Sequence, residues 1–144
     1  MLLDQLGYPA EPEHVERRLE RIASLPHARV LVAVSGGELV AVAAFQPIEL
    51  LHRTQPQCRI TGLVVRADRR REGIGRRLIE AIERMAHELG CFRLELTTRP
   101  ERPDALPFYA ALGFSERPHR LVKPILSRPP SRPSRPAQPR RRRG

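Results

Sequence analysis

Two glycines one residue apart, Gly73 and Gly75, stand in a cluster of arginines directly before a strongly patterned apolar segment. A helix N-terminus leaves its first N–H groups unpaired and carries about half a positive charge, which makes it a binding site for anions. Glycine lets a ligand approach that backbone without a Cβ in the way and permits unusual φ and ψ angles. Arg70, Arg71 and Arg76 add positive charge around the same point. The stretch therefore predicts a cradle for a diphosphate group.

Two common diphosphate motifs do not fit this stretch. A dinucleotide fingerprint requires a third glycine at position 78, where the chain has Leu78, and a P-loop requires a Gly-Lys-Ser/Thr run that this sequence lacks. The remaining alternative is that the glycines only form a tight turn.

The elements around the cradle predict a βαβ unit. Cys58–Val65 indicates a strand that ends in three consecutive apolar residues, a pattern typical of burial on both faces. Residues 74–89 repeat apolar side chains at helical spacing, and residues 91–97 alternate apolar and polar side chains as a strand does. The two strands should be parallel and joined by a right-handed crossover. The other predicted elements are a helix over 12–24, a hairpin of strands 29–34 and 39–45, a short helix over 104–112, and final strands at Phe114 and 121–125.

On these motifs the chain resembles the GNAT superfamily of acetyl-CoA-dependent N-acetyltransferases. The family signature Arg/Gln-x-x-Gly-x-Gly/Ala is similar to Arg70-Arg71-Glu72-Gly73-Ile74-Gly75, and the later family segment Phe-Tyr-x-x-Leu-Gly-Phe/Tyr is similar to Phe108–Phe114. The resemblance covers about residues 30 to 125. It implies an α/β (α+β) fold with a mixed central sheet and a βαβ cofactor unit. Family members usually open with a strand and most of a helix, so either Met1 is not the native start or the sheet lacks its first strand.

The resemblance also assigns roles to residues. In the family, the acceptor amine attacks the thioester carbonyl directly, where two central strands separate. By resemblance, a backbone N–H near Val65 polarises that carbonyl oxygen. Tyr109 aligns with the tyrosine that gives a proton to the departing thiolate, although a packing role beside Phe108 is the alternative. The implied contacts to the acyl and pantetheine arm are Leu63, Val64 and Val65, and those to the pyrophosphate are Arg70, Arg71, Glu72, Gly73, Ile74, Gly75 and Arg76.

A general base is not evident from the sequence. Glu49, His52 and Glu95 are candidates, although the sequence favours a surface or loop position for each. Because the cofactor region is basic, a cationic acceptor would require acidic residues on the other side of the site, for which Glu49 and Glu95 are again the candidates. Close bacterial relatives often carry a histidine where this chain has Leu106, which implies altered substrate choice or reduced activity.

Two functions follow from the resemblance. The first is transfer of an acetyl group from acetyl-CoA, as cosubstrate and without a metal, to a primary amine of a small molecule. The alternative is a CoA-binding module with little or no turnover that acts as a sensor or interaction partner. A homodimer is an expectation by resemblance alone.

Most of the formal charge of +10 lies at the C-terminal end. Residues 127–144 hold seven arginines and no acid, which leaves +3 for residues 1–126. We expect a domain over 1–126 and a disordered tail over 127–144, which is either an inert extension or a weak, nonspecific binder of polyanions. No apolar run of membrane-spanning length is present, so we expect no membrane insertion and a cytoplasmic protein. Cys58 and Cys91 lack metal-ligand spacing and are expected to be buried free thiols.

Overall fold

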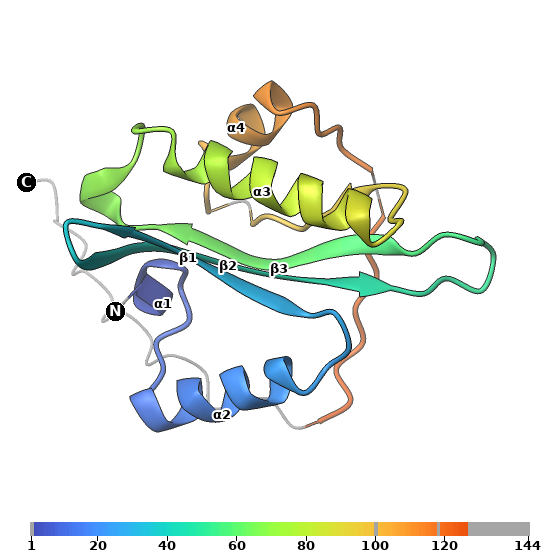
Figure 1. The fold of residues 1–144 in the computed structure, drawn as a ribbon, viewed down its shortest axis with the longest axis horizontal. Helices are drawn as coiled ribbons and strands as arrows, with labels where there is room; N and C mark the ends of the chain where they lie inside the picture. Colours follow the sequence, from blue (N-terminus) through green and yellow to red (C-terminus); the bar gives the residue numbers. More distant parts are fainter. Residues whose placement is uncertain (1, 100, 118, 127–144) are drawn as a thin grey trace, which may run out of the picture. The chain divides into compact units, whose positions relative to one another are not determined.

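The computed structural model describes residues 2–99, 101–117 and 119–126. A compact unit spans Met1–Phe114, and it holds a four-stranded mixed sheet of order β1-β2-β3-β4. Helix α3 lies on one face of this sheet, and α1 and α2 lie on the other (Figure 1). The elements are α1 (Leu2–Gln5), α2 (Pro12–Ala23), β1 (Arg29–Ser35), β2 (Glu38–Ile48), β3 (Gln57–Val65), a 3-10 turn η1 (Ala67–Arg69), α3 (Ile74–Glu88), β4 (Leu94–Glu95) and α4 (Ala105–Ala111).

The β1–β2 hairpin confirms the sequence prediction. Strands β1 and β2 are antiparallel, and the turn between them uses Gly36 and Gly37 at φ 59° and 79°. Positive φ at two successive residues is what a tight hairpin turn requires, and glycine adopts it without steric cost. Within the described chain, no strand pairs with the outer edge of β1.

The βαβ unit is also present. Strand β3 is antiparallel to β2, and β4 is parallel to β3, as predicted. The helix predicted over 74–89 is α3, and it ends before Gly90, whose φ is 73°. Strand β4 is much shorter than the predicted 91–97, since only Leu94 and Glu95 pair with β3.

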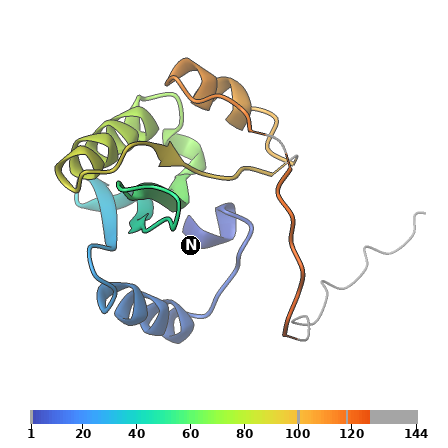
Figure 2. The same ribbon diagram turned by 90° about the vertical axis from the view of Figure 1, so that its right-hand side faces the viewer.

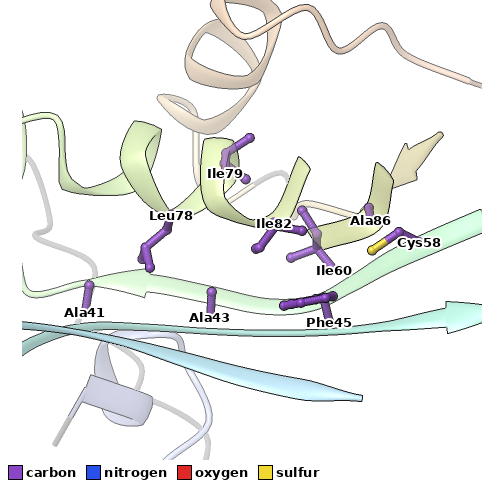
Figure 3. Packing of buried hydrophobic residues seen from close by; sticks show 9 residues of the cluster. All are labelled: Ala41, Ala43, Phe45, Cys58, Ile60, Leu78, Ile79, Ile82 and Ala86. Atoms are coloured by element: carbon purple, nitrogen blue, oxygen red, sulfur yellow. The ribbon is translucent and has the colours of Figure 1, made fainter. Parts of the chain in front are cut away.

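The core lies between α3 and the sheet (Figure 3). Leu78, Ile82 and Ala86 recur every four residues on one side of α3, and they pack on Phe45 and neighbouring small residues of β2. This spacing places them on one helical face, which explains why the apolar pattern predicted the helix. On the outer side, Glu80 pairs at 3.9 Å with Arg76, not with Arg84 as its spacing also allowed.

The two cysteines are free thiols. Cys58 is fully buried, and Cys91 is half-buried. Burial raises the pKa of the Cys58 thiol from 9.0 to about 12.

The final strands predicted at Phe114 and at residues 121–125 are wrong. The Phe114 amide donates to the Tyr109 carbonyl at 3.0 Å, so this residue completes the C-terminus of α4 beside Gly113, whose φ is 90°. Residues 115–117 and 119–126 belong to a second unit, and none of them lies in a helix or strand. Leu121 and Ile125 are more than 90% exposed, and Pro124 between them has no amide hydrogen to donate to a ladder. The tail at 127–144 lies outside the described residues, so both its expected disorder and the domain boundary at residue 126 stay predictions.

Candidate functional site

Strands β3 and β4 are joined at one end and separate at the other. Strand β3 pairs with β2 as far as Val65, but with β4 only at Cys58 and Arg59. The outer edge of β3 from Ile60 to Val65, here named the unpaired edge, therefore faces no strand in the part of the chain that the structure describes.

The unpaired edge presents backbone N–H donors. The Arg66 amide donates to the Val40 carbonyl at 2.8 Å, which fixes which residues of β3 bond to β2. In an antiparallel pair, hydrogen-bonded positions alternate with positions whose amides point away from the partner. Since the Arg66 amide points toward β2, the amides of Val65 and Leu63 point away from β2, toward the unpaired edge. A donor is therefore available near Val65, where the resemblance implied one.

Charged side chains tie β3 to β4 where the pairing ends. The Arg59 guanidinium on β3 forms an ion pair with the Glu95 carboxylate on β4. Arg93 reaches the same carboxylate at 3.2 Å, and two of its nitrogens donate to Gln57 Oε1 at 2.8 and 3.0 Å. These contacts hold the strands together up to Arg59 and Glu95, so the strands separate only beyond that point.

The start of α3 carries backbone amides with no partner. Gly73 at the N-cap has φ 77°, and the Arg77 amide donates to its carbonyl at 3.1 Å as the first bond of the helix. The amides of Ile74, Gly75 and Arg76 donate to no acceptor among the described residues. A Cβ added to Gly73 would meet no atom within 4 Å, so the space in front of this turn is open. Both features suit an anion.

The structure gives the glycine at position 75 a packing role, which differs from the expected role of letting a ligand approach the backbone. A Cβ at this buried position would lie 3.1 Å from Phe108 Cζ and 3.7 Å from Val65 Cγ2. The missing side chain therefore makes room for the Phe108 ring, which brings α4 against the start of α3. The sequence motif at Phe108 and the glycine motif meet at this contact.

The loop before α3 is braced by Arg69, a residue that the sequence analysis did not select. Its guanidinium contacts both carboxylate oxygens of Glu72 and donates to Ser35 Oγ at 3.1 Å. Hydrogen bonds from Arg69 hold the pKa of the Glu72 carboxyl below its usual value. Glu72 is thus a loop-bracing residue, and its spacing of three residues from Arg69 was the available signal.

The predicted arginines differ in how free they are. Arg70 Nε donates to the Val65 carbonyl at 3.2 Å, which fixes the loop to the end of β3. Arg71 is exposed, has φ 65°, and its guanidinium has no partner within the described ranges. Among the described residues, Arg76 makes one long ion pair, with Glu80 at 3.9 Å. Arg71 is therefore the arginine most available to a phosphate group.

Tyr109 lies on α4 in an aromatic cluster. Its ring contacts Phe108 and Phe114 edge-on, at centroid distances of 5.0 and 5.5 Å, and packs against the core. Burial raises the pKa of the phenol, and the positive charge of Arg102 partly offsets that rise. The phenol therefore holds its proton at neutral pH, as a proton donor must.

The candidate bases fall in two places. Glu49 and His52 are exposed in the loop between β2 and β3, which the pairing of Ile48 with Gln57 puts at the opposite end of β3 from Val65. The eight residue steps from Gln57 to Val65 span roughly 25 Å, so neither side chain reaches Val65. Glu95 lies at the junction of β3 and β4 and is held by two arginines.

Two surface hollows lie away from the unpaired edge. One of about 320 Å³ lies between the β1–β2 hairpin and the start of α3, and the other, of about 450 Å³, is lined by the segment from Asp4 to Arg18. The first is lined by Ala33, Val34, Ser35, Val40, Arg69, Glu72, Ile74, Arg77 and Leu78. Its lining includes Glu72 and Ile74, two of the predicted diphosphate contacts, whereas the second hollow includes none of them.

A profile of the acetyltransferase (GNAT) family matches residues 2–114. The chain belongs to this family. Among solved structures, it is 31% identical to a transcriptional regulator from Bacillus halodurans C-125, with a TM-score of 0.74 and coverage of 87% of this chain and 86% of that one. It also shares the fold of the aminoglycoside N-acetyltransferase AAC(6')-Iy solved in complex with CoA, at 23% identity and a TM-score of 0.75, covering 86% and 84% of the two chains.

Among curated proteins, this GNAT chain is 36% identical to N-acetyltransferase family 8 member 3 of Rattus norvegicus over 87 residues. That match covers 59% of this chain and 37% of the rat protein. The chain thus spans less than half the length of the curated relatives it matches. Within the described ranges, none of its helices has the length and apolar character needed to cross a membrane.

Proposed function

We propose that this GNAT chain is an acetyl-CoA-dependent N-acetyltransferase that acts by direct attack of a small-molecule primary amine. The observation that carries the proposal is the unpaired edge of β3 beside three unpartnered amides at the start of α3. Acetyl-CoA needs donors of both kinds, because its diphosphate is anionic and its thioester oxygen becomes anionic during transfer. The CoA complex of the aminoglycoside acetyltransferase that shares this fold supports the same assignment.

The residues present fit this cosubstrate. The amides of Ile74, Gly75 and Arg76, with the open space at Gly73 and the free charge of Arg71, would hold the diphosphate. The amides of Leu63 and Val65 would take the pantetheine arm and the thioester oxygen. Cofactor binding thus depends mostly on the backbone, which explains why few side chains in the site are free.

Tyr109 would act in the second half of the reaction. The amine nitrogen forms a bond to the carbonyl carbon, the carbon–sulfur bond breaks, and the sulfur takes the phenolic proton. The amine proton passes to water, and the phenolate recovers a proton from solvent. The raised pKa of Tyr109 keeps this proton in place until sulfur becomes basic enough to accept it.

A pair of matched glycine variants tests the cosubstrate site. Gly73→Asp places a carboxylate in the proposed diphosphate site, whereas Gly37→Asp adds the same charge at nearly the same φ, 79° against 77°, in the hairpin turn. Acetyl-CoA is titrated calorimetrically into the full chain at raised ionic strength, so that the arginines of 127–144 contribute little. We expect micromolar binding by the wild type and by Gly37→Asp, and at least tenfold weaker binding by Gly73→Asp. Equal affinities of the two variants would place the diphosphate elsewhere.

One observation favours the alternative function, which is CoA binding with little turnover. Glu49 and His52 lie at the opposite end of β3 from Val65, and two arginines already occupy the carboxylate of the third candidate base, Glu95. Binding of acetyl-CoA together with failure to acetylate any amine would favour this alternative over the enzyme.

A further inference from the structure

The acceptor must reach the unpaired edge from the side of the sheet that carries α1. On the α3 side, the protein's own side chains Leu63, Val65 and Tyr109 pack against the core. On the other side the nearest covering is α1, whose neighbour Leu6 would lie 3.8 Å from a Cβ at Gly62. Figure 2 shows α1 and α2 on this face of the sheet, away from α3 and α4.

Two arginines join the N-terminal segment to the loop before α4. The Arg99 guanidinium stacks on the Tyr8 ring at 4.1 Å, and Arg102 donates to the Gln5 carbonyl at 2.7 Å. The Gln5 side chain in turn accepts a hydrogen bond of 2.7 Å from the Ala67 amide, just beyond the end of β3. Both guanidiniums therefore stand near the end of the unpaired edge.

These arginines keep unused charge and donors. Neither Arg99 nor Arg102 has an acidic partner among the residues described, and Arg102 uses one donor on Gln5. The influence of Arg102 on the Tyr109 phenol shows that its charge acts close to the proposed proton donor. A carboxylate accepts parallel hydrogen bonds from a guanidinium and so matches these free donors.

Neither carboxylate that was expected to attract a cationic acceptor offers unbalanced negative charge near Val65. Glu49 lies at the far end of β3, and the charge of Glu95 is already balanced by Arg59 and Arg93. A polycation would meet arginines on this side of the sheet without a free carboxylate from either expected residue.

We infer that Arg99 and Arg102 bind a carboxylate of the acceptor, so that the substrates are small amines that also carry a carboxylate, such as free amino acids. This inference rests on the proposed acetyltransferase function. It assigns Arg99 and Arg102 as specificity residues and excludes polyamines and aminoglycosides as preferred acceptors.

Pairs of acceptors that differ in one charge test the inference. CoA release from acetyl-CoA is measured with the twenty proteinogenic amino acids, their carboxamides, spermidine and kanamycin. We expect the best acceptor to be an amino acid, with kcat/KM at least tenfold above that of its own carboxamide, mainly through KM. In the double variant Arg99→Gln/Arg102→Gln this ratio should fall to about threefold or less. Arg84→Gln, an exposed position on α3, is the control that should keep the wild-type ratio.

Binding provides a second readout that does not need turnover. The preferred amino acid and its carboxamide are titrated into the CoA-saturated protein, and the difference in affinity should disappear in the double variant. If loss of the Gln5 contact unfolds Arg102→Gln, Arg99→Gln alone should still reduce the acid-over-amide ratio about threefold. A preference for a carboxamide, spermidine or kanamycin overturns the inference, and so does transfer to no carboxylate-bearing amine. Loss of acetyl-CoA binding itself would instead contradict the proposed function.

Discussion

At the scale of single residues, a substitution at Tyr109 can distinguish a role in proton donation from a role in packing. Tyr109→Phe keeps the ring contacts with Phe108 and Phe114 and removes only the hydroxyl. We expect kcat to fall by roughly a hundredfold, the usual contribution of a positioned acid, with the KM for acetyl-CoA unchanged. Steady-state kinetics on a variant with a native circular dichroism spectrum measure this, and an unchanged kcat would leave Tyr109 a packing residue.

The structure gives Glu95 a structural role that competes with its candidate role as the general base. Its carboxylate joins β3 to β4 through Arg59 and Arg93, so Glu95→Gln should weaken the fold. Because these side chains are between 26% and 48% exposed, we expect a loss of only about 1 kcal/mol in the free energy of unfolding. The acidic limb of the pH–rate profile should not move. A shift of that limb, with stability unchanged, would make Glu95 the base after all.

Cys58 should make the fold sensitive to alkali. The folded thiol has a pKa raised by burial to about 12, against 9.0 when exposed, so the folded state holds its proton where the unfolded state loses it. The unfolded state then binds fewer protons, and stability falls as pH rises from 9 toward 12. Urea unfolding at several pH values should show this decline, and it should be shallower in Cys58→Ala. Equal slopes would mean that the thiol does not control the decline.

At the scale of elements, features that depend on neighbouring residues were easier to predict from the sequence than features that depend on strand pairing. The hairpin turn and α3 were predictable because glycine positions and helical spacing are properties of neighbouring residues. The length of β4 was not, because the alternation of Phe92, Leu94 and Leu96 reports burial. Leu96 packs against the core without pairing to β3, so its pattern looked like that of a strand. The contact of Arg102 with Gln5 joins residues 97 positions apart and left no local sign in the sequence.

The contact between α3 and α4 gives a prediction at this scale. Gly75→Ala puts a methyl group 3.1 Å from the Phe108 ring, which overpacks the junction. We expect a loss of about 1–3 kcal/mol in the free energy of unfolding. Gly62→Ala is the matched control, since its methyl group would lie at an ordinary 3.8 Å from Leu6 and should change stability little. Equal urea midpoints for the two variants would show that the Phe108 ring moves without cost.

At the scale of the whole molecule, positive charge is distributed in two distinct ways. In the compact unit, one group of arginines holds structure, because Arg59, Arg69 and Arg93 are bound to carboxylates or to a side-chain amide oxygen. Residues 127–144, outside the described part, carry seven arginines with no acid in the same stretch. The first group is balanced locally, whereas the second leaves the chain strongly cationic.

This difference predicts that binding to polyanions depends on residues 127–144, whereas binding of acetyl-CoA does not. Full-length chain should bind a mixed-sequence single-stranded DNA with an affinity that falls steeply as salt is added, because each arginine paired with a phosphate releases counterions. Deleting residues 127–144 removes seven of these charges and should flatten the slope of log K against log salt by up to about 5. Calorimetric binding of acetyl-CoA at raised ionic strength is the control, and the deletion should leave it unchanged. DNA binding that survives the deletion with the same slope would assign the polyanion surface to the compact unit.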